Sequence, residues 1–208
     1  MHWPDTIVPI EESLKAFDAL VKEGKVRYIG TSNDSAYGLT KANEISKYKG
    51  YSRFESIQNN FSLLNPRFHD ELANVCRLEN ISLLPYSPMA GGVLSGKYCG
   101  GFYPEGSRFE TYLKESNKRV QAMAHRFVNE RTLEATKKYL ELAKEYEVSP
   151  VTLAISYSKH FDFVASTIVG ARKIEQLDDS LKAFDFKISS ELLKKIEIIQ
   201  KNILYPMG

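Results

Sequence analysis

The sequence GKVRYIGTSN at residues 24–33 joins the end of a helix to a strand, and that strand to a polar loop. Gly24 is a typical stop for the helix predicted over residues 9–22, whose apolar side chains recur at helical spacing. Residues 26–30 alternate in polarity and include β-branched side chains, as expected of a strand. The polar residues 31–35 supply a loop and a helix cap. This stretch therefore predicts a helix–strand–helix order, with the second helix over residues 37–48.

The same alternation continues along the chain. We predict a strand over 54–58, a helix over 66–78, a strand over 81–85, helices over 131–146 and 150–159, a strand over 163–169, and helices over 174–183 and 189–199. The helix over 150–159 opens with Ser149-Pro150 as cap and first-turn proline. Strands that alternate with helices predict an α/β fold with parallel strands.

The composition is that of a globular chain without a strong electrostatic field. Of the 208 residues 43% are hydrophobic and 26% charged, and 28 basic against 26 acidic residues give a formal net charge of +2. This balance favours neither nucleic acid nor an anionic membrane as a general partner. No targeting segment or membrane-spanning stretch is evident. Cys76 and Cys99 lack the spacing of a metal site or a redox motif, which favours structural thiols, no bound metal and a cytoplasmic location.

Residues 87–129 interrupt the alternation and are predicted to form a long connection. Between Arg108 and Arg131, cationic side chains stand beside aromatic ones, a combination that also occurs in nucleic-acid interfaces. Acidic residues interrupt this pattern, among them Glu110 and Glu115. We therefore favour a mobile, solvated loop over a nucleic-acid interface.

Polar residues follow the ends of the predicted strands, where the functional face of a parallel α/β protein lies. They are His2, the pair Ser32-Asn33, the stretches 58–60 and 86–88, and the loop 170–172. Each has a structural alternative. His2 is also consistent with a solvated residue, Ser32-Asn33 with a helix cap, residues 58–60 with ordinary loop polarity, Tyr86 with a half-buried aromatic residue, and Arg172 with a solvated helix start.

Four ordered motifs together resemble the aldo-keto reductase family. They are HWPD at 2–5, GKVRYIGTSN at 24–33, QNNFSLLN at 58–65 and YSPMAGGVLSGKY at 86–98, and the resemblance covers essentially the whole chain. It is greatest to the branch that contains bacterial open-chain reductases and potassium-channel β subunits. The resemblance implies an NADPH-dependent reduction of aldehydes or ketones to alcohols in a TIM barrel. The fold class we expect is α/β, a partial (β/α)8 TIM barrel with about four βα units of the C-terminal half.

The catalytic set implied by the resemblance is Asp, Tyr, Lys and His. His2 matches the histidine, which would orient the carbonyl and help stabilise developing charge. The other three roles match no position in this sequence, and none of its twelve tyrosines stands in the matching context. We therefore expect residues 1–208 to form one partial barrel domain whose N-terminal half is absent.

The cofactor-binding set implied by the resemblance is more complete. Ser32, Asn33 and Gln58 would hydrogen-bond the nicotinamide carboxamide, and Tyr86 would stack on its ring. The pyrophosphate would be held by Ser87, Pro88, Met89, Gly91, Lys97 and Arg108. The loop Gly170-Ala171-Arg172 would lead into a helix whose amino terminus receives an anion, and Arg172 with Lys173 would bind the 2′-phosphate. Gln176, Asp179 and Ser180 match adenine-side positions, although the family pattern usually has Asn where this chain has Ser180. No GxGxxG fingerprint occurs, which fits a barrel reductase better than a Rossmann dehydrogenase.

Half a barrel leaves apolar side chains and strand edges uncovered. The chain would then be a truncated product, would fold alone with poor stability, or would pair with a second copy or a complementary half. We expect self-association or such pairing. Two further hypotheses about function remain: a non-catalytic NADP(H)-binding or interaction module, and a structural remnant without ligand affinity.

Overall fold

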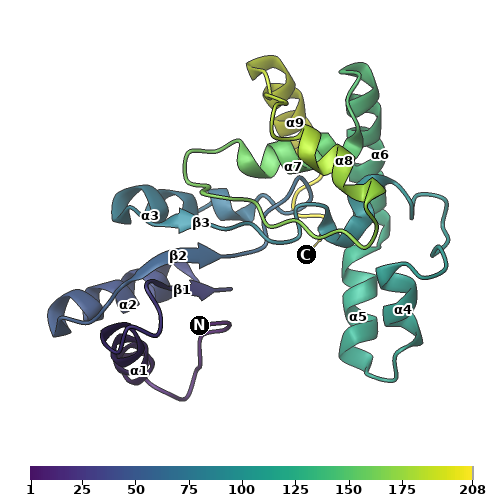
Figure 1. The fold of residues 1–208 in the computed structure, drawn as a ribbon. Helices are drawn as coiled ribbons and strands as arrows, with labels where there is room; N and C mark the ends of the chain where they lie inside the picture. The colour runs from purple at the N-terminus through teal and green to yellow at the C-terminus, as the bar shows by residue number, and fades with distance from the viewer. Residues whose placement is uncertain (208) are drawn as a thin grey trace. The chain divides into compact units, whose positions relative to one another are not determined.

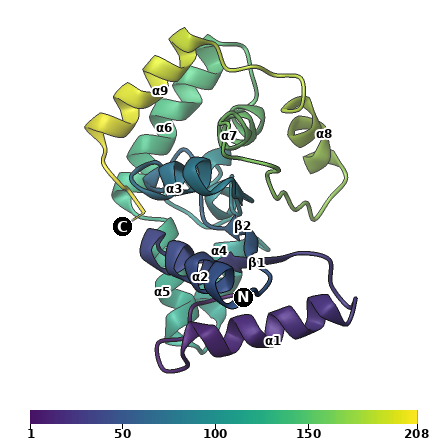
Figure 2. The same ribbon diagram turned by 90° about the vertical axis from the view of Figure 1, so that its left-hand side faces the viewer.

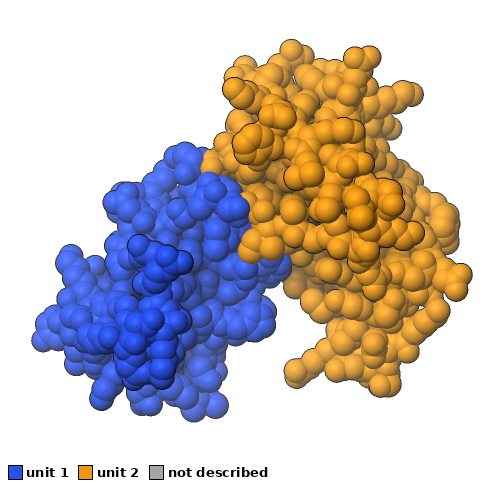
Figure 3. All heavy atoms as spheres, viewed as in Figure 1, with its two compact units in different colours: residues 1–60, 67–86, 162–166 blue, residues 61–66, 87–161, 167–208 orange. Residues whose placement is uncertain are grey.

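The computed structural model of this chain describes residues 1–207, which fall into two compact units (Figure 3). Unit 1 comprises Met1–Asn60, Arg67–Tyr86 and Asp162–Ser166. Unit 2 comprises Phe61–Pro66, Ser87–Phe161 and the residues from Thr167 onward. Each unit therefore draws on segments that lie far apart in the sequence.

Unit 1 contains a parallel sheet with the strand order β1-β2-β3 (Figure 1). The strands are β1 (Ile29–Ser32), β2 (Phe54–Gln58) and β3 (Ser82–Leu83). On the β3 edge of the sheet, Val164 forms an isolated parallel bridge with Leu83. On the other edge, the ammonium group of Met1 donates a hydrogen bond of 2.6 Å to the carbonyl of Gly30. The parallel α/β architecture predicted from the sequence is confirmed.

The helices of unit 1 are α1 (Ile10–Lys22), α2 (Ala36–Lys49) and α3 (Leu72–Glu79), preceded by the 3-10 turn Arg67–His69. Along the sheet, α2 lies between α1 and α3 (Figures 1 and 2). Ser35 caps α2 because its hydroxyl accepts the backbone N–H of Gly38. Gly24 has a φ of +70°, as a helix stop requires.

The core of unit 1 forms between these helices and the sheet. Leu14, Leu39, Phe54 and Ile57 are completely buried there. The buried amide of Asn43 on α2 pairs with both backbone groups of Phe54, donating to its carbonyl at 3.2 Å and accepting its N–H at 3.0 Å. This pairing satisfies polar backbone groups that would otherwise be buried without partners.

Unit 2 is helical in its regular structure. After the 3-10 segment η2 (Ala90–Ser95) come α4 (Arg108–Lys114), α5 (Lys118–Phe127), α6 (Glu130–Glu145), α7 (Pro150–Lys159), α8 (Glu175–Lys182) and α9 (Ser190–Asn202). The segment η2 packs against α4, α5, α6 and α7. Ser149 caps α7, with Pro150 in its first turn, as predicted.

Five predictions about local structure are wrong. The strand expected at 81–85 covers only Ser82–Leu83, and the helix expected at 66–78 is the 3-10 turn Arg67–His69 followed by α3. The first strand covers Ile29–Ser32 rather than residues 26–30, because Tyr28 is 79% exposed and lies outside the sheet. Residues 163–169 contribute only the bridge at Val164 rather than a strand of that length. The segment from Arg108 to Arg131 was expected to be a mobile, solvated part of the long connection 87–129. It contains the helices α4 and α5 instead, and the buried rings of Phe109 and Phe127 lie 5.2 Å apart between centroids.

Candidate functional site

A hydrogen-bonded cluster forms where the parallel strands of unit 1 end. The Ser32 hydroxyl donates to the carbonyl of Gln58 at 2.7 Å, and the backbone N–H of Asn33 donates to the same carbonyl at 3.1 Å. The Tyr86 hydroxyl donates to Oδ1 of Asn33 at 2.6 Å. The structure therefore brings together residues of three different loops that the family resemblance assigns to one end of the cofactor.

Asn33 is the centre of this cluster. Its Nδ2 donates to the Ser32 hydroxyl at 3.0 Å and to the backbone carbonyl of His2 at 3.1 Å. Its φ of +55° lies in the left-handed region, which asparagine tolerates better than most side chains. Both ends of the amide therefore have protein partners, and a ligand would have to replace one of them.

The helix-cap alternative for Ser32 and Asn33 is wrong, because Ser35 provides the cap of α2. Ser32 and Asn33 lie before the cap and direct their side-chain hydrogen bonds toward β2, Tyr86 and His2. Their polarity consequently serves contacts between loops rather than the helix terminus.

Gln58 contributes its backbone carbonyl to the cluster, whereas its side-chain amide has no hydrogen-bond partner within residues 1–207. Asn59 and Asn60, which follow Gln58, also have side-chain amide atoms without partners in the described part of the chain. The Oδ1 atoms of Asn59 and Asn60 are buried, and neither has a partner among the described residues. Three amide groups beyond β2 thus keep acceptor or donor capacity that the protein leaves unused.

His2 joins the cluster through its backbone alone. Its carbonyl accepts from Asn33, while its exposed ring stands edge-on to Trp3 with 6.0 Å between centroids. Within residues 1–207 the imidazole forms no hydrogen bond. The structure thus places the histidine beside the candidate nicotinamide-binding residues but does not orient its ring.

In unit 2, residues 87–92 form a loop with several left-handed residues. Ser87 has φ +54°, and Ala90, Gly91 and Gly92 follow with +48°, +66° and +96°. The backbone N–H groups of Ala90 and Gly92 already donate to the carbonyls of Ser87 and Met89, at 2.8 and 2.9 Å, so an anion would have to displace these bonds to use them. Glycine is needed at Gly91, because a Cβ there would lie 2.4 Å from the ring of Phe109.

Cations accompany this loop. The ammonium of Lys97 lies 2.9 Å from where a Cβ on Gly92 would stand, and it also lies 5.2 Å from the centroid of the Tyr98 ring. The guanidinium of Arg172 donates to the carbonyl of Gly106 at 2.7 Å, which brings Arg172 next to the segment that begins α4 at Arg108. Arg108 and Arg172 are both exposed.

The residues predicted to face adenine already have structural partners. Oε1 of Gln176 accepts the backbone N–H groups of Arg172 at 2.8 Å and Lys173 at 3.3 Å. The Ser180 hydroxyl donates to the carbonyl of Gln176 at 3.0 Å. Oδ2 of Asp179 accepts from Ser149 at 2.8 Å, and Oδ1 pairs with Lys182 at 3.0 Å. These hydrogen bonds, that of Ser149 first, lower the pKa of Asp179.

Sequence reasoning assigned no role to Thr31 and Asp34, which support the cluster, and treated Asn59 only as one of the polar residues 58–60. Asp34 is only 6% exposed, and its carboxylate accepts the Thr31 hydroxyl at 2.9 Å. The amide of Asn59 donates to the backbone carbonyl of Asp34 at 3.2 Å. The sequence signal was the uninterrupted polar run 31–35, which we interpreted only as a loop and cap.

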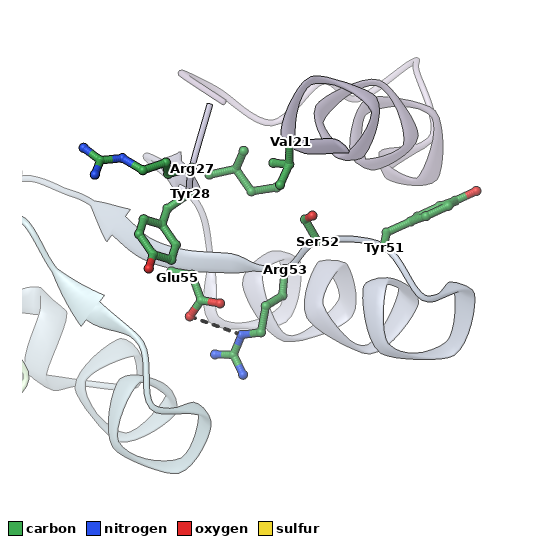
Figure 4. Close-up of a pocket in the computed structure, with 8 residues that line it drawn as sticks. Val21, Arg27, Tyr28, Tyr51, Ser52, Arg53 and Glu55 are labelled. Carbon is green, nitrogen blue, oxygen red and sulfur yellow. Dashed lines mark ion pairs between the residues drawn. The ribbon is translucent and has the colours of Figure 1, made fainter. Parts of the chain in front are cut away.

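Two cavities of the described residues contain none of the cluster residues. One of about 270 Å³ opens at the amino-terminal ends of β1 and β2, away from the cluster, and is lined in part by Val21, Tyr28 and Arg53, with Arg53 beside Glu55 (Figure 4). Another of about 310 Å³ in unit 2 is lined by Lys159, His160 and Phe186 among others. Neither contains a residue predicted to bind cofactor.

The described residues contain neither a candidate metal site nor a candidate membrane-spanning helix. Within residues 1–207, no group of three or more His, Cys, Asp or Glu side chains could hold a metal ion. The described helices include none with the length and apolarity needed to cross a membrane.

Comparison with known proteins gives a consistent result. The family model described as "Aldo/keto reductase family" matches residues 1–201. "Protein tas" of Escherichia coli is 32% identical over 207 residues, which cover 98% of this chain and 57% of that protein. A Schizosaccharomyces pombe protein provisionally named a voltage-gated potassium channel subunit beta is 31% identical over 201 residues, 95% of this chain and 57% of its own length. "Uncharacterized oxidoreductase YrpG" of Bacillus subtilis is 27% identical over 199 residues, 96% of this chain and 56% of that protein. The chain thus spans little more than half the length of these curated relatives.

Proposed function

Because this chain belongs to the aldo/keto reductase family, a family of oxidoreductases, we propose that it binds NADP(H) and contributes to the NADPH-dependent reduction of aldehydes or ketones to alcohols. The observation that carries the proposal is the cluster of Ser32, Asn33 and Tyr86 at the ends of the parallel strands. Its hydroxyl and amide groups match the paired donor and acceptor of a nicotinamide carboxamide.

The residues present fit this cofactor in each unit separately. In unit 1, the side-chain amide of Gln58 and the buried Oδ1 of Asn60 have unused hydrogen-bonding capacity among the described residues. In unit 2, the exposed cations Lys97, Arg108 and Arg172 suit phosphate groups. Arg172 would discriminate NADPH from NADH through the 2′-phosphate.

The adenine-side part of the proposal needs a rearrangement. The oxygen atoms of Gln176 and Asp179 are engaged by Arg172, Lys173, Ser149 and Lys182, so adenine would contact the remaining amide nitrogen of Gln176 or displace one of these bonds. Ser180 returns its hydroxyl to the helix backbone. We therefore assign most of the cofactor affinity to the nicotinamide and phosphate contacts.

When bound, NADPH supplies a hydride to the carbonyl carbon of the substrate. The contribution of this chain is to fix the face of the nicotinamide ring through Ser32, Asn33 and Gln58 and to cover it with Tyr86. His2 would donate a hydrogen bond to the carbonyl oxygen, where negative charge develops. A proton donor is also needed for this reaction, and we assign that role to no residue of residues 1–208.

We further propose that the sheet of unit 1 is part of a (β/α)8 barrel, and that residues 1–208 act together with a second copy or a complementary half. Parallel strands in sequence order and the bridge from Leu83 to Val164 support this proposal. On α8, the apolar side chains of Ile174, Leu177 and Leu181 are exposed, at 79%, 38% and 66%. Such an apolar helix face is typically covered by another protein segment.

Two free thiols, at Cys76 and Cys99, suit a reducing compartment such as the cytoplasm.

A non-catalytic NADP(H)-binding module is the second candidate, favoured by the exposed and unbonded imidazole of His2. Carbonyl-dependent oxidation of NADPH distinguishes the two candidates. The enzyme proposal expects consumption of NADPH that requires an aldehyde and falls in a His2→Ala variant. If NADPH binds but no aldehyde or ketone is reduced, the chain is a binding module.

A further inference from the structure

The loop after β1 contains a buried carboxylate that no sequence motif assigns. Asp34 is 6% exposed, and among residues 1–207 no cationic group forms an ion pair with it. A buried charge without an ion pair is costly unless hydrogen bonds or dipoles stabilise it. The partners of this carboxylate therefore indicate what it does.

The two oxygen atoms of the Asp34 carboxylate bind on either side of Asn33. Oδ2 accepts the Thr31 hydroxyl at 2.9 Å, and Oδ1 accepts the backbone N–H of Ser35 at 2.8 Å. These bonds join residues 31 and 35 across the turn in which Asn33 holds its left-handed φ of +55°. The backbone carbonyl of Asp34 accepts from Asn59, which ties the same turn to the loop after β2.

Two positive groups lie near this carboxylate: the ammonium of Met1, which interacts with it electrostatically, and the amino terminus of α2. The first turn of α2 contains no acidic residue, so Asp34 is the carboxylate next to the positive end of this helix. Gly38 allows the close approach, because a Cβ there would lie 2.1 Å from Oδ1 of Asp34. The carboxylate is thus held between the turn and the helix.

Resting on the proposed NADP(H) function, we propose that Asp34 is a positioning residue that holds the 31–35 turn so that Asn33 presents its amide to the nicotinamide carboxamide. Asp34 itself contacts no cofactor group. It acts through the two hydrogen bonds that fix the backbone on both sides of Asn33.

Two substitutions separate hydrogen bonding from charge. Asp34→Ala removes both bonds. Asp34→Asn keeps them, because the amide oxygen accepts from the Ser35 N–H and the amide nitrogen donates to the Thr31 hydroxyl. Asp18→Ala is a control for loss of a buried carboxylate of unit 1: Asp18 is 5% exposed, accepts the N–H and hydroxyl of Ser52, and also forms an ion pair with Lys22 at 2.6 Å.

The experiment measures the affinities of wild type and variants for NADPH and for adenosine 2′,5′-bisphosphate, which lacks the nicotinamide. We expect Asp34→Ala to weaken NADPH binding about tenfold, equivalent to about 1.4 kcal/mol, and to leave adenosine bisphosphate binding unchanged. Asp34→Asn should bind NADPH like wild type, and Asp18→Ala should leave the ratio of the two affinities unchanged. Equal weakening of both ligands by Asp34→Ala, or an unchanged NADPH affinity, would overturn the inference.

A second readout does not depend on the cofactor. We expect the side-chain amide protons of Asn33 to exchange with solvent slowly in wild type and Asp34→Asn, and faster in Asp34→Ala. If wild type binds neither ligand, the proposed function fails, and this NMR measurement still decides the role of Asp34. Unchanged exchange in Asp34→Ala would overturn it.

Discussion

Replacing Asn33 by alanine and by glycine separates its two roles, as a hydrogen-bonding amide and as a left-handed residue. Both substitutions remove the amide that binds Ser32, Tyr86 and the carbonyl of His2. Only alanine is strained by a φ of +55°, because glycine adopts this conformation without steric cost. The two variants should therefore differ in unfolding free energy but have similar affinities for the cofactor.

The magnitudes follow from the contacts. Each lost hydrogen bond contributes about 0.5–1.5 kcal/mol, so both variants should lose about 2–4 kcal/mol of unfolding free energy. A left-handed alanine costs about 1–2 kcal/mol more than glycine. The greater unfolded-state entropy of glycine offsets about 0.4–1 kcal/mol of that difference. Asn33→Gly should consequently be more stable than Asn33→Ala by up to about 1.6 kcal/mol, with a midpoint of about 0.8 kcal/mol.

Urea unfolding of the two variants and wild type measures these differences, and NADPH titration measures the effect on the site. Both variants should bind NADPH about equally weakly, since neither retains the amide. The reasoning is refuted if Asn33→Ala is as stable as Asn33→Gly, or if either variant binds NADPH as tightly as wild type.

Four other predictions concern packing, protonation and association. Gly38→Ala should destabilise the chain by about 1–3 kcal/mol in urea unfolding, because its Cβ would lie 2.1 Å from the Asp34 carboxylate, whereas Gly170→Ala, with no atom within 4 Å of the added Cβ, should have little effect. Burial raises the pKa of Cys76 to about 11, so Ellman's reagent at pH 8 should label it slowly in the native chain and rapidly in urea; rapid native labelling contradicts this. The folded-state pKa of Asp179 is lowered, so its ionised carboxylate stabilises the folded chain above the ordinary carboxyl pKa near 4. This contribution is lost as the pH falls below that range. The melting temperature of Asp179→Asn should therefore fall less between pH 7 and pH 3 than that of wild type. Light scattering at micromolar concentration should show an assembly larger than a monomer that Leu181→Asp weakens, and a monomeric wild type would count against self-association.

Sequence periodicity predicted the helices of this chain better than its strands. The helix predicted at 150–159 has the observed bounds, because Ser149 and Pro150 encode its start locally. The strand at 54–58 was also placed correctly. Residues 26–30 and 163–169 have equally suitable β-branched and aromatic side chains, but strand length depends on pairing with distant partners. Of residues 163–169, only Val164 forms a bridge, with Leu83 of β3.

The residue types of the candidate site could be predicted from the sequence, but the hydrogen-bond partners of those residues could not. Ser32, Asn33 and Tyr86 do come together, as the resemblance implied. The sequence could not show that Asp34 is buried, since its carboxylate is stabilised by the approach of α2. Nor could it show that Gln176 and Asp179 bind within unit 2, because those bonds depend on where Ser149 and Arg172 lie after folding.

Fluorescence titration of the purified chain with NADPH, and with NADH as the control, tests the central claim most directly. The account predicts saturable binding that prefers NADPH and weakens in Arg172→Ala and Asn33→Gly. Absence of binding up to about millimolar NADPH would contradict it, as would equal affinity for NADH.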